Sequence, residues 1–314
     1  MPRKRPILAL ALTAGALALP SSAAALPLPG APGCPIFPAD NQWNQRVDGL
    51  AVAQDSGAIV ASIGLDEGLH PDFGSGRYNG APIGIPFKAV PGSQPKARVR
   101  FQYADESDRG PYPIPSNVPI EGGRRSDGDR HVLLVDRDAC RLYELYATYP
   151  TRNSRRWRAG SGAIWDLGSN ALRPEGWTSA DAAGLPILPG LARYDEVRTE
   201  RIDHALRFTV ERSRRAFVYP ARHFASDLDD ASLPAMGQRL RLKSAVNIAG
   251  YPPQAQVVLQ AMKEYGLIVA DNGSDWFVSG APDPGWDNDD LRQLGGIKGS
   301  DFEVVDTSTL PRPG

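Results

Sequence analysis

The chain has 314 residues, with 35 lysines and arginines against 36 aspartates and glutamates, and a formal net charge of −1. Because no basic excess is present to neutralise a phosphate backbone, nucleic-acid binding is disfavoured. Hydrophobic residues make up 41% and charged residues 23%, which is typical of a folded globular protein. The 32 glycines and 29 prolines disfavour a helix bundle and favour short strands joined by many turns.

The first residues predict a secretory signal peptide over residues 1–25. A basic start at 2–5 precedes an apolar run at 7–19, and three alanines at 23–25 suit a cleavage site. The apolar run is shorter than the roughly 20 residues that a membrane span needs, and no later stretch approaches that length. We therefore expect a secreted, extracellular protein with no membrane span, which begins near Leu26.

The cysteine content agrees with export. Cys34 and Cys140 are the two cysteines of the chain, and an even pair in an oxidising compartment most simply forms one disulfide. The bond would close a loop of about 106 residues, for which loop-closure entropy predicts a stabilisation of roughly 4–5 kcal/mol. A metal site is not expected from two cysteines without a CxxC motif.

The domain organisation is simple, because no low-complexity linker, charge block or internal repeat divides the chain. We expect a flexible leader at 26–33, a single β-rich domain at 34–306 and a short tail at 307–314. We expect the protein to be a monomer.

The first predicted elements, in chain order, are a helix and two hairpins. Asp55 can cap a short helix that Gly64 ends. Two β-hairpins follow, because apolar runs flank tight polar links. Their strands are expected at 131–136 with 141–149, and at 205–211 with 215–220.

The remaining elements lie in the last third of the chain. Residues 239–248 alternate apolar and polar side chains, which is typical of a half-buried strand. The longest helix follows Pro252, and Gly266 suits its end. A third hairpin is indicated by the turn pair Asn272-Gly273. Its strands are expected at 267–271 and 276–280. A short helix is expected to begin at Asp287, and a last strand is expected at 302–306.

These elements predict a mainly β fold with an α+β edge: a single antiparallel β-sandwich or barrel-like domain with long loops and two or three short helices. Irregular stretches longer than roughly 12–15 residues are usually functional or disordered. The stretch at 166–196, called the second long loop below, is apolar enough that we expect it to be ordered and packed. The four irregular stretches are 104–130, 166–196, 219–235 and 279–290.

Several common catalytic motifs are absent from the chain. It has no GxGxxG opening a helix, no GxxxxGK[ST], no GxSxG and no HExxH. Nucleotide-dependent chemistry and the commonest serine-hydrolase and zinc-protease arrangements are therefore disfavoured, and no cofactor is expected.

Acidic residues in the long loops are the first candidates for catalysis. Two carboxyl groups with different pKa values are the minimum that glycoside hydrolysis needs. The candidates are Asp105, Glu106, Asp181 and Asp195. The alternative interpretation is structural, with solvated turn residues at 105–106 and a helix cap at Asp181.

Histidines near predicted strand ends offer a second chemistry. If His131, His204 and His223 meet near arginines such as Arg207, they could abstract a proton as in a polysaccharide lyase, or bind a metal. No two of them are close in the sequence, so one structural hydrogen bond for each histidine remains the alternative.

Tryptophans in loops suit carbohydrate binding, because a flat amphipathic ring stacks on the apolar face of a sugar. Trp177 and Trp286 lie in loops rich in glycine and proline and are the candidates, with core packing as the alternative. The acidic runs at 227–230 and 287–290 could bind a structural calcium ion, although neither matches an EF-hand. The second run also suits a helix N-terminus.

The favoured hypothesis is a secreted glycoside hydrolase that acts on an extracellular polysaccharide through paired loop carboxylates. The alternative is a non-catalytic protein that binds glycans or interacts with the cell envelope. A polysaccharide lyase that uses histidine, arginine and tyrosine is the second alternative.

Overall fold

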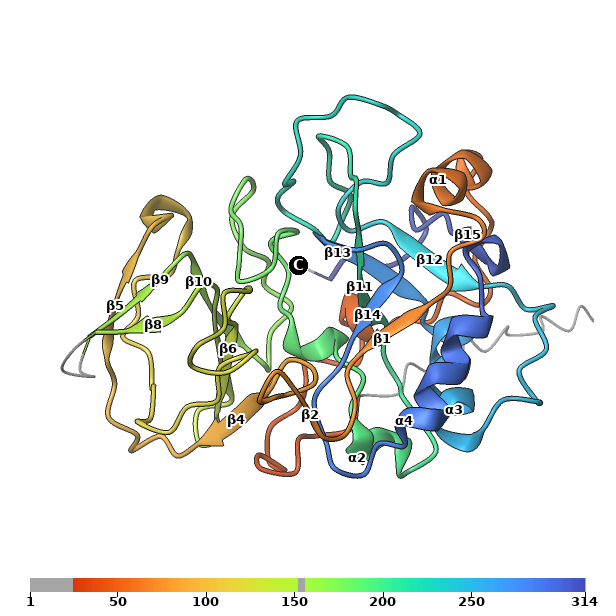
Figure 1. Cartoon of the computed structure of the whole chain (residues 1–314). Coiled ribbons are helices and arrows are strands. Elements are labelled where there is room, and N and C mark those ends of the chain that lie inside the picture. Colours follow the sequence, from red (N-terminus) through yellow and green to blue (C-terminus); the bar gives the residue numbers. More distant parts are fainter. Residues whose placement is uncertain (1–24, 152–155, 314) are drawn as a thin grey trace, which may run out of the picture.

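The computed structural model describes residues 25–151 and 156–313, so the predicted signal peptide lies outside the described residues apart from Ala25. Within these ranges the strands form several open sheets, none closed into a barrel, accompanied by a few short helices (Figure 1). The expected mainly β fold with long loops is therefore confirmed. No described helix is both long and apolar enough to cross a membrane.

A six-stranded mixed sheet forms one half of the molecule. Its strand order is β1-β14-β11-β13-β12-β15, and the β1–β14 and β11–β13 pairs are parallel. The strands are β1 (His70–Asp72), β11 (Leu206–Val210), β12 (Arg239–Leu242), β13 (Leu267–Asn272), β14 (Phe277–Ser279) and β15 (Phe302–Val304). The helices are α1 (Ser56–Ile63), α2 (Tyr194–Val197), α3 (Pro253–Glu264) and α4 (Asn288–Arg292). Apolar side chains from the sheet and from α1, α3 and α4 share one core.

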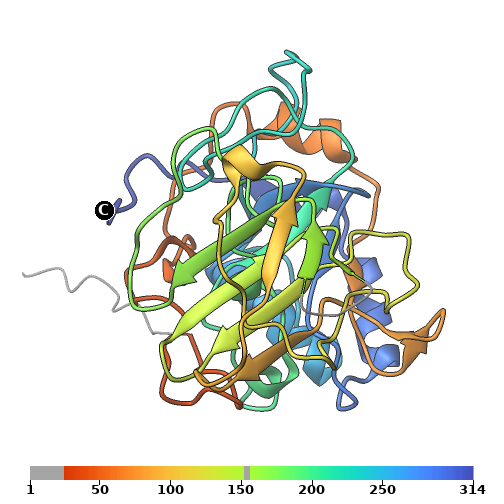
Figure 2. The same ribbon diagram turned by 90° about the vertical axis from the view of Figure 1, so that its left-hand side faces the viewer.

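Two smaller sheets pack face to face in the other half (Figures 1 and 2). One sheet has the order β10-β7-β6-β4 and the other β5-β9-β8. Buried side chains such as Leu134, Tyr143 and Trp157 fill the space between them. The strands are β4 (Phe87–Val90), β5 (Arg98–Phe101), β6 (Val132–Asp136), β7 (Arg141–Leu145), β8 (Tyr149–Pro150), β9 (Arg156–Ala159) and β10 (Gly162–Asp166), and β2 (Arg77–Tyr78) and β3 (Ala81–Pro82) form a separate ribbon.

The first predicted hairpin and the helices agree with the structure. Strands β6 and β7 pair antiparallel, as expected for 131–136 and 141–149. Gly64 follows α1, and Gly266 adopts a positive φ of 74° after α3. Asp287 caps α4 through the backbone N–H groups of Asp289 and Asp290.

Three strand predictions are wrong. Residues 215–220 do not pair back onto β11, because Phe217 forms a bridge with Met236. Strands β13 and β14 do not form a hairpin, since β11 lies between them and the Gly273 N–H donates to its Val210 carbonyl. The strand predicted at 239–248 ends at Leu242, after which the chain turns.

The predicted disulfide is present and anchors the amino-terminal segment. The Cα atoms of Cys34 and Cys140 lie 5.2 Å apart. The segment at 26–33, expected to be a flexible leader, is instead packed, because Leu28 and Ala31 are buried against strands β6, β7 and β10.

The second long loop is ordered and packed, as expected. Ile187 and Leu188 are buried beside β7, and Leu185 is buried in the core of the six-stranded sheet. The Glu144 carboxyl group on β7 accepts hydrogen bonds from the N–H groups of Ile187 and Leu188 at 2.9–3.0 Å. Burial raises the pKa of Glu144 to about 7, although the two N–H groups oppose the shift. A buried titratable acid thus attaches the loop to the sheet.

The disulfide should contribute strongly to stability. Replacing both cysteines, as Cys34→Ser with Cys140→Ser, removes the constraint on a loop of 106 residues in the unfolded chain. We expect the free energy of unfolding to fall by roughly 4–5 kcal/mol, measured by urea denaturation. Reduced wild-type protein is the control and should behave like the variant. An unchanged denaturation midpoint in both would contradict the prediction.

Glu144 should make stability depend on pH. Between pH 4.5 and about 7 the unfolded chain has released this proton while the folded chain retains it, so its contribution to stability declines as pH rises. Glu144→Gln removes this dependence, and the stability of the variant relative to wild type should rise across that range by up to roughly 3 kcal/mol. Urea denaturation at several pH values measures it. Glu175→Gln, at an exposed carboxyl group, is the control, and parallel wild-type and Glu144→Gln curves would refute the idea.

Candidate functional site

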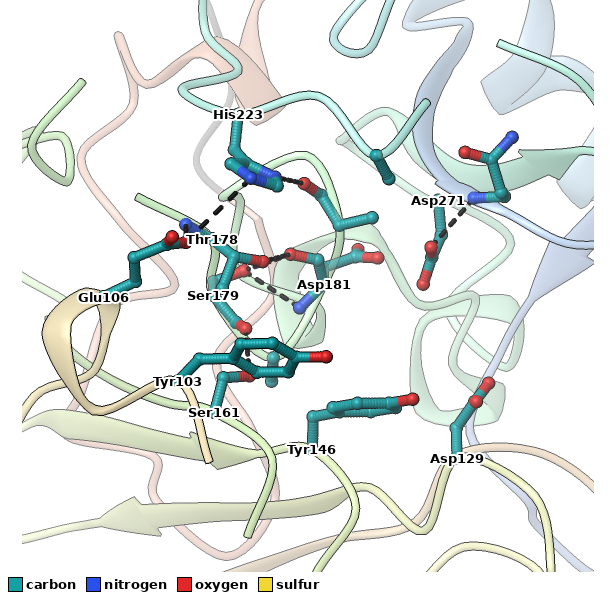
Figure 3. A pocket seen from close by; sticks show the side chains of 14 residues that line it. Tyr103, Glu106, Asp129, Tyr146, Ser161, Thr178, Ser179, Asp181, His223 and Asp271 are labelled. Atoms are coloured by element: carbon teal, nitrogen blue, oxygen red, sulfur yellow. Dashed lines mark hydrogen bonds and ion pairs between the residues drawn. The ribbon is translucent and has the colours of Figure 1, made fainter. Parts of the chain in front are cut away.

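A pocket of about 390 Å³ lies where the long loops meet the six-stranded sheet (Figure 3). Three of the four irregular stretches predicted from the sequence contribute to its wall, together with the ends of strands. The lining residues are Tyr103, Glu106, Asp129, Tyr146, Ser161, Thr178, Ser179, Ala180, Asp181, Ala182, His223, Ala225, Asp271 and Asn272.

A buried ion pair supports one wall of the pocket. Asp181, in the second long loop, accepts two hydrogen bonds from Arg207 on β11, at 2.7 Å from Nε and 2.8 Å from Nη2. The Arg207 side chain is 5% exposed and that of Asp181 is fully buried. Gly184 permits the close turn that follows, because its φ is +69° and a Cβ there would lie 2.5 Å from the Trp177 carbonyl oxygen. The loop is therefore held against β11 by charge.

Asp271, at the end of β13, lies beside this ion pair. Its Oδ2 is 3.3 Å from Nη2 of Arg207, and its Oδ1 accepts the backbone N–H of Asn272 at 2.8 Å. Burial and the neighbouring Asp181 carboxylate raise the pKa of Asp271 to about 8, against the opposing effect of Arg207. At neutral pH the pocket thus contains a carboxylic acid that can donate a proton.

A second carboxyl group approaches the pocket from the opposite side. Glu106 accepts the N–H of Thr178 at 3.1 Å, and its Oε2 lies 3.9 Å from Nε2 of His223. Figure 3 shows Glu106 and Asp271 on opposite sides, with the rings of Tyr103 and Tyr146 along a third. Two carboxyl groups and two aromatic rings therefore surround one space.

His131 braces the pocket from behind. Its Nδ1 lies 2.6 Å from the Glu121 carboxylate and its Nε2 lies 3.0 Å from the carbonyl oxygen of Ala180. Burial opposes the charged imidazolium, yet Glu121 raises the pKa of His131 to about 9. Since both partners are acceptors, both ring nitrogens donate, and the imidazolium holds the backbone next to Asp181.

One group in the described ranges has the composition of a metal site. Candidate ligand atoms of Glu121, Asp129 and His131 all lie within 4.8 Å of one another. Both His131 nitrogens already donate hydrogen bonds, which leaves this ring without a lone pair for a metal. In this arrangement Glu121 and Asp129 are the remaining donors, and two carboxylates are fewer than a protein metal site ordinarily uses.

The structure brings some of the predicted site residues together. Glu106, Asp181 and His223 line the pocket, and Arg207 and His131 support it from behind. Tyr103, Tyr146, Asp129 and Asp271 belong to the pocket but were not singled out by the sequence reasoning. The sequence signal that could have indicated Asp271 is its position as an acid at the end of the apolar run LIVAD at 267–271.

The other predicted residues lie outside the pocket lining. Asp105 is exposed and Asp195 is paired with Arg193. His204 is buried, with its ring nitrogens bonded to Glu196 and to the Ala205 carbonyl oxygen. Trp286 is buried against Phe73 and Tyr194, which gives the core packing that was the alternative. Trp177 is half-buried with the Arg173 guanidinium over its ring at 5.4 Å.

The acidic runs considered for calcium have local roles. Asp287 caps α4, and Asp230 accepts a hydrogen bond from Ser232.

Comparison of the chain with protein-family models, curated proteins and solved structures finds no match. The function is therefore argued from the pocket itself.

Removing the charge of Asp181 should destabilise the fold. Asp181→Asn leaves the buried Arg207 guanidinium without its principal counter-charge, and we expect the free energy of unfolding to fall by about 3–5 kcal/mol. Thermal and urea denaturation measure the loss. The matched control is Glu175→Gln, which removes an exposed partner of Arg222 and should cost less than about 1 kcal/mol. Equal effects of the two substitutions would count against the role given to Asp181.

Proposed function

We propose that this protein is a secreted glycoside hydrolase that acts on an extracellular polysaccharide. One observation carries the proposal: the carboxyl groups of Asp271 and Glu106 occupy opposite sides of one pocket, and burial raises the pKa of Asp271 to about 8. Glycosidases use two carboxyl groups on either side of the bond that is cleaved. Of the four acids predicted from the sequence, Glu106 keeps a catalytic role and Asp181 takes a positioning role. Asp271 is the second catalytic acid in place of the others.

Asp271 is the general acid in this mechanism. It donates its proton to the glycosidic oxygen as the bond from that oxygen to the anomeric carbon breaks. Glu106 accepts a proton from the attacking water or attacks the anomeric carbon itself, and the separation of the two carboxyl groups around the bound sugar decides between these routes. When water attacks directly, Glu106 ends with a proton of that water and Asp271 is a carboxylate, and the proton returns to Asp271 through solvent. When Glu106 attacks, Asp271 as a carboxylate takes a proton from the water that hydrolyses the ester between the sugar and Glu106, so both acids regain their starting states.

The surroundings of Asp271 favour its protonated form. Burial raises its pKa, and the adjacent Asp181 carboxylate, which accepts two hydrogen bonds from Arg207, adds to this effect. The rings of Tyr103 and Tyr146 suit sugar stacking, the role first assigned to tryptophans.

Two of the three predicted histidines are unavailable as bases for a lyase reaction. His131 and His204 have both ring nitrogens bonded, so neither is free to abstract a proton from a sugar. The Arg207 guanidinium is bonded to Asp181, Ser279 and Asp271 and is not available to neutralise a uronate.

The test is incubation of the purified protein with a panel of polysaccharides, followed by assay of new reducing ends and of the absorbance of unsaturated products. We expect reducing ends without that absorbance. Asp271→Asn and Glu106→Gln should each lower the rate by at least about 100-fold, the usual effect of losing a general acid or base. Asp105→Asn is the matched control, because Asp105 adjoins Glu106 but lies outside the pocket lining, and it should keep wild-type activity.

The rate should also fall at alkaline pH. Asp271 is the proton donor and its pKa is about 8, so the rate should decline as pH rises through this value. A rate that is independent of pH between 6 and 9 would exclude Asp271 as the acid. Depletion of the protein by an insoluble glycan without new reducing ends would instead identify a non-catalytic binding protein.

A further inference from the structure

The sheet formed by β5, β9 and β8 has an arginine-rich outer face. Strand β5 reads Arg-Val-Arg-Phe and β9 reads Arg-Trp-Arg-Ala, and in both strands exposed arginines alternate with residues that face the core. The outward set, called the arginine face below, consists of Arg98, Arg100, Arg156 and Arg158. Figure 2 turns this end of the molecule towards the viewer.

The pairing of the strands places like charges side by side. Arg98 is opposite Arg156, and Arg100 is opposite Arg158, on neighbouring parallel strands. Strands lie about 4.8 Å apart, and like charges directly opposite one another destabilise a sheet. No residue in the described ranges offers any of these four guanidinium groups a hydrogen bond or ion pair. The arrangement has a physical advantage only when an anion lies over it.

A groove on this face supplies a shape for such a ligand. A cavity of about 560 Å³ is lined by Arg100 and Arg158 together with Tyr149, which is opposite Arg158 on β8. Tyr149 is 39% exposed, and the Arg130 guanidinium lies 4.1 Å from the centre of its ring. Guanidinium groups beside a supported aromatic ring can bind an anionic group and the apolar face of a sugar together.

The groove adjoins the candidate active site. At three places, consecutive residues of the chain line the two surfaces. Gln102, Ala147 and Gly160 line the groove. Their neighbours Tyr103, Tyr146 and Ser161 line the pocket. A single extended chain can therefore contact both surfaces. Because the pocket has acidic walls at Glu106 and Asp129, negatively charged groups are favoured on the arginine face and disfavoured in the pocket.

We propose that the arginine face is a binding site for an anionic polysaccharide, a chain that bears uronate or sulfate groups. A nucleic acid is a poorer occupant, because its closely spaced phosphates require more cations than a patch of four arginines on a chain without basic excess supplies. The site binds polymer independently of Asp271 and Glu106, so it does not depend on the proposed hydrolysis.

The test measures binding of the full protein to polygalacturonate, dextran sulfate, neutral dextran and a single-stranded oligothymidylate at several salt concentrations. We expect binding to the first two, no binding to dextran and weaker binding to the oligonucleotide. The variant Arg100→Gln with Arg158→Gln should weaken polysaccharide binding at least 10-fold and reduce the steepness of its salt dependence. The matched control is Arg198→Gln with Arg212→Gln, which removes the same charge at exposed positions elsewhere, and it should bind as wild type.

Two further readouts separate the outcomes. Without ligand, the double variant at 100 and 158 should have an unchanged or higher melting temperature at low salt, because like-charge repulsion is relieved. Asp271→Asn should bind as wild type even if it is inactive. Absence of binding by wild type, equal weakening in the control variant, or preference for the oligonucleotide would overturn the assignment.

Discussion

The buried ion pair between Asp181 and Arg207 is the interaction on which the pocket depends. Removing two charges from water is costly, and a buried pair persists only where further hydrogen bonds satisfy it. Here the Arg207 guanidinium also donates hydrogen bonds to Ser279 and Asp271, and His131 donates to the neighbouring Ala180 carbonyl oxygen. The pair attaches the second long loop to β11, and the Asp181 carboxylate adds to burial in raising the pKa of Asp271. The same ion pair therefore holds the loop in place and affects the pKa of Asp271.

The pocket and the arginine face beside it carry charges of opposite sign. Carboxyl groups line the pocket, with Arg207 enclosed behind them, whereas the adjoining arginine face presents four exposed guanidinium groups without a hydrogen-bond or ion-pair partner among the described residues. The net charge of −1 does not reveal this separation, because it sums the charges of the whole chain. Neighbouring surfaces of opposite sign favour a ligand whose charge also varies along its length.

Local sequence patterns predicted the elements more reliably than their arrangement. The apolar run at 131–136 and its partner strand form the expected hairpin, since both the strands and the turn are encoded within a few residues. The turn pair Asn272-Gly273 predicted the third hairpin, but its hydrogen bonds go to Val210 on β11, which lies between the two strands. Likewise, Trp286 was expected in a loop open to solvent, yet its ring packs against Phe73 from a distant segment.

The sequence by itself determined the mainly β class, the disulfide and the long loops that surround the pocket. These follow from local alternation, from a cysteine count that allows one pairing, and from stretches without periodicity. Only the tertiary structure decided which acids share a site. Asp181 and Asp271 meet at Arg207 because β11 pairs with β13. That pairing joins strands separated by a long stretch of chain, and no short-range pattern of residues specifies it.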